Sequence, residues 1–299
     1  MGKIKKAISV ATGSILLGST LLLGCTVYTE SKKQPQDKKV EEKVLNELNR
    51  QSIDGIMTEL KDRKSSLKFS GYNFDFDNAD ILKYYKGNSD KLVIYIRDIH
   101  KSSAFEGKNL VQDNLYNTID ELYNENGIDL LVLEGGHEEE LTKGWIKENG
   151  ISFLQNIYWY LSYGFWTPET KDQSLIAFSG GVAYEYFNDT KIKTCGAEDA
   201  NIHETAWYIA TNKVKSEGQA WLFEEIILNK RSEIGVEKTL DYMKNSGKKE
   251  AVLVFGAAHT KKILEHLEKK GVSYVVVQPK GIDDYIQALD KYVMPMPKQ

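Results

Sequence analysis

The chain has 299 residues, of which 41% are hydrophobic, 27% charged and 11% aromatic. This length and composition exclude an intrinsically disordered or fibrous protein and allow a sizeable hydrophobic core. The formal net charge of −4 argues against nucleic acid as a partner, because phosphate binding needs a concentrated basic surface. Two cysteines are too few for a disulfide framework, and no zinc-finger spacing occurs.

The first 25 residues have the pattern of an export signal. A short basic start precedes an apolar run over residues 7–24, which is short and glycine-rich for a permanent membrane span. The run ends in Leu22-Leu23-Gly24-Cys25, which resembles the lipobox of bacterial lipoproteins, where the cysteine is diacylated. We therefore expect residues 1–24 to be a signal peptide, with lipidated Cys25 holding the chain at the extracytoplasmic face of the cell membrane. An uncleaved anchor helix is the alternative.

The mature chain is predicted to consist of a tether and one domain. Residues 25–39 contain almost no apolar side chains, which is typical of a flexible linker. Residues 40–64 place apolar side chains near helical spacing, which predicts one or two helices. No composition shift or fixed-period repeat divides the remainder, so we expect a single α/β domain over residues 40–299.

The body of the chain alternates dense apolar runs with segments of helical periodicity. Strands are predicted at 91–101, 128–134, 191–199, 250–259 and 272–279. Helices are predicted at 109–124, 201–245, 260–270 and 282–292, with a helical insertion around 138–188. Apolar strands that alternate with helices are typical of a buried parallel sheet. We predict an α/β fold with a central, mainly parallel sheet and helices on both faces.

Ionisable residues follow four of the five predicted strands. They are Asp98 and His100 after the first strand, Glu134 after the second, Glu198 after the third and His259 after the fourth. The ligand cleft of an open parallel sheet lies beyond the carboxyl ends of its strands, so these side chains meet if the strands are neighbours. Each of these residues taken alone is explained by a capping hydrogen bond at the end of its strand. Their occurrence at the ends of four strands favours a functional site.

Two kinds of chemistry suit His100, Glu134 and His259, with Glu198 and Asp98 in support. Neutral imidazoles and a carboxylate can hold a divalent metal with an open position, where a bound water becomes a nucleophile. Without a metal, the same residues supply a general base and a carboxylate that orients it. The residue types alone do not decide between a metal-bound site and a metal-free acid–base site.

The strand ends also resemble a known superfamily. The motifs, in chain order, are Asp98-Ile99-His100, Leu131-Val132-Leu133-Glu134-Gly135, Gly196-Ala197-Glu198-Asp199 and Gly256-Ala257-Ala258-His259. They are similar to motifs of the superfamily that groups ChaN-type haem-uptake lipoproteins, TraB-type pheromone-shutdown proteins, Tiki proteases and erythromycin esterases. The similarity spans about residues 92–281. Arg97 stands where the first G-x-x-H motif of the family has glycine, and Gln112 resembles a glutamine that some members carry.

The branches of this superfamily imply different functions. The resemblance to Tiki proteases implies a metal-dependent protease, and the resemblance to erythromycin esterases implies a metal-independent hydrolase. From the two we expect a protease- or esterase-type hydrolase, metal-assisted through His100, Glu134 and His259, with a small-molecule or peptide substrate. The resemblance to ChaN implies the alternative, a lipoprotein that binds haem or another planar ligand without catalysis. The aromatic residues within 151–166 motivate this alternative because they offer a stacking surface, although packing of a buried helix explains them too.

Replacing Cys25 by alanine tests the predicted lipid anchor. We expect the Cys25→Ala chain to stay unprocessed or to be released, because its thiol is the acylation site and the tether has no other apolar anchor. Metabolic labelling with a fatty-acid analogue should mark the wild type and a Cys195→Ala control, but not Cys25→Ala. Equal labelling of all three chains would refute the assignment.

Overall fold

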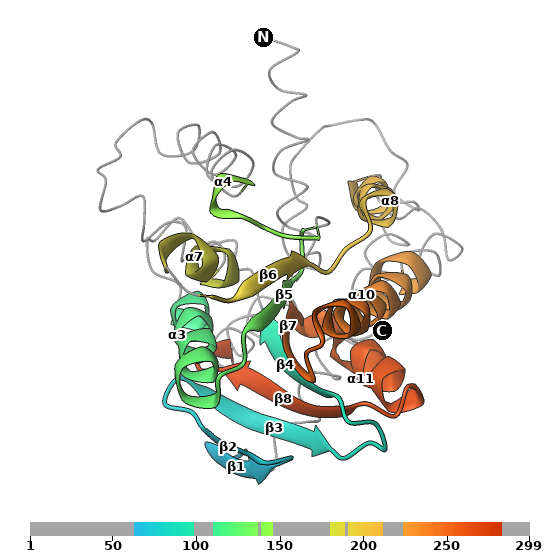
Figure 1. Cartoon of the computed structure of the whole chain (residues 1–299). Helices are drawn as coiled ribbons and strands as arrows, with labels where there is room; N and C mark the ends of the chain where they lie inside the picture. The colour runs from blue at the N-terminus through green and yellow to red at the C-terminus, as the bar shows by residue number, and fades with distance from the viewer. Residues whose placement is uncertain are drawn as a thin grey trace, which may run out of the picture.

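A six-stranded sheet forms the centre of the computed structural model, which describes residues 63–98, 110–136, 139–145, 180–188, 191–211 and 224–282. The strand order is β3-β8-β4-β7-β5-β6 (Figure 1). The strands span Ala79–Tyr85 (β3), Leu92–Asp98 (β4), Leu130–Leu133 (β5), Lys193–Gly196 (β6), Glu250–Gly256 (β7) and Ser273–Pro279 (β8). All neighbours are parallel except β3, which runs antiparallel to β8.

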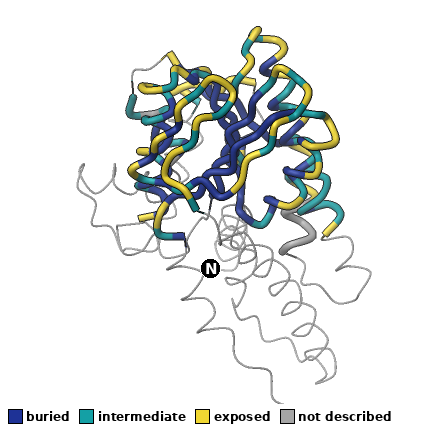
Figure 2. Tube along the Cα trace, turned by 90° about the horizontal axis from the view of Figure 1, so that it is seen from below, coloured by how far each residue is buried: buried dark blue, intermediate teal, exposed yellow. Residues whose placement is uncertain are grey.

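The five parallel strands coincide with the five that the sequence predicts. Every residue of β4, β5 and β8 is buried, which is why their sequences are continuous apolar runs and do not alternate. Figure 2 shows this buried centre, with exposed residues around it. The prediction of an α/β fold with a mostly parallel central sheet is therefore confirmed.

Successive residues of the strands pack into two hydrophobic clusters. In β4, Leu92, Ile94 and Ile96 belong to one cluster, and Val93 and Tyr95 belong to the other. The first cluster includes side chains of the helices Leu110–Asn126 (α3) and Gly180–Phe187 (α7). The second includes side chains of Arg231–Ser246 (α10) and Thr260–Lys269 (α11). Opposite sides of the same strand are thus held by different helices (Figure 1).

The sequence analysis missed the strands that precede β4. A hairpin joins Ser66–Phe69 (β1) to Tyr72–Asp75 (β2) through Ser70 and Gly71, whose φ angles are 52° and 90°. Positive φ at both central residues is what a two-residue type I′ hairpin turn requires. Strand β3 then closes the sheet edge beside β8. Lys64, placed at the end of a predicted helix, instead pairs with Ile81 in an isolated antiparallel bridge.

Other predicted elements are described only in part. The helical region 201–245 contains Ala200–Thr211 (α8), a π-helical segment Glu224–Lys230 (η3) and α10. Of the predicted insertion, the structure describes Lys143–Trp145 (α4) and α7. The signal peptide, the tether, the aromatic residues within 151–166 and the helix predicted at 282–292 fall outside the described residues, apart from Ile282. Within the described ranges, no helix combines the length and apolarity of a membrane span.

A close backbone approach beside β8 generates a stability prediction. A Cβ at Gly87 would lie 2.1 Å from the carbonyl oxygen of Gly271, so alanine forces two backbone segments apart. We expect Gly87→Ala to lower the free energy of unfolding by about 1–3 kcal/mol, as overpacking does. Gly144→Ala is the control, because its Cβ has Thr142 Oγ1 at 3.7 Å as nearest described neighbour. Urea denaturation of both variants checks this, and equal stability would contradict the contact.

Candidate functional site

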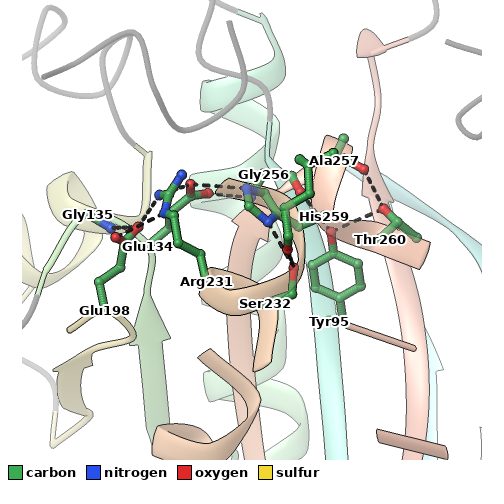
Figure 3. A network of polar contacts seen from close by, with 11 residues as sticks. Tyr95, Glu134, Gly135, Glu198, Arg231, Ser232, Gly256, Ala257, His259 and Thr260 are labelled. Carbon is green, nitrogen blue, oxygen red and sulfur yellow. Dashed lines mark hydrogen bonds and ion pairs between the residues drawn. The ribbon is translucent and has the colours of Figure 1, made fainter. Parts of the chain in front are cut away.

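The strand order brings three of the sequence-predicted residues together. Because β7 lies between β4 and β5, and β6 lies next to β5, the carboxyl ends of these four strands form one edge. Along it follow Asp98 at the end of β4, His259 after β7, Glu134 after β5 and Glu198 after β6. Glu134, Glu198 and His259 join one network of polar contacts, drawn in Figure 3.

Arg231 occupies the centre of this network. Its Nη2 donates to Glu134 Oε1 at 2.7 Å and also to Glu198 Oε1, while its Nε donates to Glu198 Oε2 at 3.2 Å. The three side chains are only 2–3% exposed. Glu134 Oε2 accepts a hydrogen bond from the backbone N–H of Gly256, the last residue of β7. Both oxygens of Glu134 are therefore held by the protein.

One buried cation between two carboxyl groups shifts their pKa values apart. Burial raises the pKa of Glu134 to about 8, aided by the negative charges of Glu198 and Asp98 and opposed by Arg231. Burial also opposes ionisation of Glu198, but the charge and hydrogen bonds of Arg231 outweigh it and lower the pKa of Glu198 below its usual value. These opposite directions favour the ionised form of Glu198, in its ion pair with Arg231, and the protonated form of Glu134.

His259 faces this pair from the turn after β7. Its Nε2 lies 3.9 Å from Glu134 Oε1, and its Nδ1 lies 2.9 Å from Ser232 Oγ. The ring of Phe255 packs edge-on against the imidazole, with a centroid distance of 4.7 Å. Burial, together with the charge of Arg231, lowers the pKa of His259 well below its usual value, so the buried imidazole is neutral.

Side chains of the sheet and of α11 hold the turn that carries His259. Tyr95, in β4, donates through its hydroxyl to the carbonyl oxygen of Gly256 at 3.0 Å and contacts Thr260 Oγ1 at 3.1 Å. Thr260 in turn donates to the carbonyl oxygen of Ala257 at 2.7 Å. The residues on both sides of His259 are thereby tied to the strand beside β7.

Asp98 and Arg97 belong to the same edge of the sheet but bond to other elements. Asp98 accepts a hydrogen bond from Gln112 of α3. Arg97 is buried and donates through Nη1 to Gln278 Oε1 of β8 at 2.9 Å. His100 lies outside the described residues, which end at Asp98 on this side, so its expected place in the site stays a prediction.

Sequence reasoning missed Arg231 and Ser232. They are the first residues of α10, directly after the π-helical segment η3, and both are buried. The surrounding Lys230-Arg231-Ser232-Glu233 has the composition of a solvated helix face, and no motif marks it. The π-helical segment that precedes them, a feature frequent at functional sites, is visible only in the structure.

The described contacts fit a divalent metal poorly. Among the described residues, no group of three or more His, Cys, Asp or Glu side chains is placed to hold one. A guanidinium already donates to Glu134 Oε1 and an N–H to Oε2, so a metal at this carboxyl group has to compete with both donors. The expected ligand set of His100, Glu134 and His259 includes His100, which lies beyond the described ranges.

Cys195 is the free cysteine of the described part of the chain and lies buried in β6. Burial raises the pKa of its thiol to about 11, which leaves almost no thiolate at neutral pH. A buried, protonated thiol of this kind packs as a small apolar side chain and is a poor nucleophile.

In comparisons with known proteins, no family model, curated protein or solved structure matches the chain.

Arg231→Met tests the electrostatics of the site. We expect the free energy of unfolding to fall by about 3–5 kcal/mol at pH 7, because removing one partner leaves a buried carboxylate uncompensated. The pKa of Glu198 is lowered in the fold, so its ion pair stabilises at neutral pH and that contribution fades as pH falls below the usual carboxyl value. The deficit of the variant should therefore shrink in acid.

Arg63→Met is the matched control for this measurement. Arg63 pairs with Asp80 at 3.6 Å, with side chains 25% and 23% exposed, so its loss should cost below about 1 kcal/mol. Denaturation of both variants at pH 7 and pH 4 gives the comparison. A similar, pH-independent loss in both would contradict the buried ion pair.

Proposed function

We propose that this edge of the sheet carries the acid–base centre of a hydrolase that acts on a small-molecule or peptide substrate. The observation that supports it is the approach of His259 Nε2 to Glu134 Oε1, 3.9 Å apart within a buried network that Arg231 organises. This distance is too long for a direct hydrogen bond but suits one oxygen that contacts both atoms at about 2.8 Å. A water molecule or a substrate oxygen has this geometry.

In the proposed reaction, His259 acts as the general base. The attacking water gives its proton to Nε2 while its oxygen bonds to the carbonyl carbon of the substrate. Glu134, which holds a proton at neutral pH, gives that proton to the leaving group. The proton on Nε2 then passes to the Glu134 carboxylate, which restores both groups. Proton transfers of this kind contribute roughly 10²- to 10⁴-fold to rates.

Arg231 and Glu198 serve this chemistry by position and charge. Their ion pair fixes the orientation of Glu134 through the bond at 2.7 Å. When Glu134 loses its proton to the leaving group, the guanidinium stabilises the resulting carboxylate inside the fold. This is the electrostatic role that a metal has in the metal-assisted form, which would add His100 to Glu134 and His259 as ligands.

The proposal extends to the whole chain. Lipidated Cys25 would hold the hydrolase at the extracytoplasmic membrane surface, at the end of the tether over residues 25–39. We also propose that helices cover both faces of the sheet along its full width, and that residues 138–188 form a helical insertion. The aromatic residues within 151–166 would then lie in this insertion.

Substitutions of the two acid–base residues test the proposal. On a panel of activated esters and peptides, His259→Ala and Glu134→Gln should each lower kcat about 10²- to 10⁴-fold. His266→Ala is the control, because His266 lies on α11 outside the polar network and should leave turnover unchanged. Full activity of the His259→Ala chain would reject the assignment, whatever the substrate.

Removal of metal ions distinguishes a hydrolase that relies on Arg231 from a metal-assisted one. Activity should survive dialysis of the purified protein against a chelator, because Arg231 supplies the positive charge. Loss of activity that Zn²⁺ restores would instead favour the metal-assisted form with His100. A Soret-band titration that shows haem binding, in a chain that hydrolyses nothing on the panel, would favour the ligand-binding alternative.

A further inference from the structure

The hydroxyl of Ser232 lies between the imidazole of His259 and the backbone of η3. Its Oγ is 2.9 Å from His259 Nδ1 and donates to the carbonyl oxygen of Leu228, four residues earlier in the chain. Ser232 and His259 are 0% and 1% exposed. The contact therefore takes place in the interior, where unsatisfied donors and acceptors are costly.

Proton counting at this contact assigns the tautomer of His259. A serine hydroxyl has one proton, and Ser232 gives it to Leu228, so its Oγ can only accept from Nδ1. An accepting Oγ 2.9 Å from Nδ1 requires a proton on Nδ1. A neutral imidazole has one N–H, so Nε2 carries the lone pair.

We propose that Ser232 is a positioning residue that keeps the proton of His259 on Nδ1 and directs the bare Nε2 toward Glu134. Figure 3 shows the ring between Ser232 and the Glu134–Arg231 pair, with its two nitrogens facing opposite partners. The edge-on ring of Phe255 limits rotation of the imidazole. The catalytic consequence rests on the proposed function, because only a bare Nε2 can take a proton from water.

The junction of η3 and α10 sets this geometry. Leu228 belongs to the π-helical segment and Ser232 to the α-helix, so their hydrogen bond spans the change in helix type. The same junction places Arg231, the neighbouring residue, against Glu134 and Glu198. One irregularity of the backbone thus orients both members of the acid–base pair.

Nitrogen-15 NMR of the imidazole rings of the full-length chain tests the tautomer directly. We expect His259, identified by the signal missing from His259→Gln, to show a protonated Nδ1 and a bare Nε2. Ser232→Ala should give a mixture of tautomers, and Ser232→Thr, which restores a hydroxyl, should give the wild-type spectrum. Ser246→Ala is the matched control, because Ser246 makes the same four-residue bond in α10, to Tyr242 O at 2.6 Å.

Kinetics supply the second readout. Ser232→Ala should lower kcat about 10- to 100-fold with KM unchanged, as losses of orienting partners do, whereas Ser246→Ala should match the wild type. A protonated Nε2 in the wild type would overturn the proposal without any variant, as would a wild-type spectrum in folded Ser232→Ala. If the tautomer shifts as expected but the chain hydrolyses nothing, the positioning role stands and the hydrolase proposal fails.

Discussion

A single buried guanidinium shared by two carboxyl groups is the constraint on which the rest of the site depends. Arg231, Glu134 and Glu198 are each almost fully removed from water, and one positive charge cannot balance two negative ones there. The imbalance shifts the two pKa values in opposite directions, which favours an ionised Glu198 and a protonated Glu134. A buried ion pair is costly to desolvate, so its place at the carboxyl edge of a parallel sheet fits a functional role better than a purely stabilising one.

The fold could be predicted from local sequence as far as single strands, but not their order. Apolar runs identified β4, β5, β7 and β8, since a strand buried on both sides leaves no room for polar alternation, whereas β6 follows from a shorter and more polar segment. Nothing local indicates that β7 enters between β4 and β5, because that is decided by crossover connections. The short hairpin before β3 was missed although its residues alternate between more and less exposed positions, because only dense apolar runs were taken as strands.

The difference between local sequence signals and tertiary arrangement also explains which residues of the site could be predicted. Glu134, Glu198 and His259 directly follow buried strands, so position alone marked them. Arg231 lies 97 residues from Glu134 in the sequence, in a charged stretch that resembles an exposed helix, and its burial comes from tertiary packing. Ser232 is equally unmarked, since a serine that bonds to the backbone four residues earlier is common in helices.

The strand order also decides when this protein can fold as it is synthesised. Both neighbours of β4 in the sheet, β7 and β8, are the last two strands of the described chain, and β3 likewise has only β8 as a partner. A growing chain therefore carries β3 and β4 unpaired until β7 and β8 have been made, and among the described strands only the β1–β2 and β5–β6 pairings are available earlier. Closure of the sheet has to wait for residues 250–279, so the nascent polypeptide stays open until these two strands have left the ribosome, and a chain truncated before β7 lacks the centre of its own sheet.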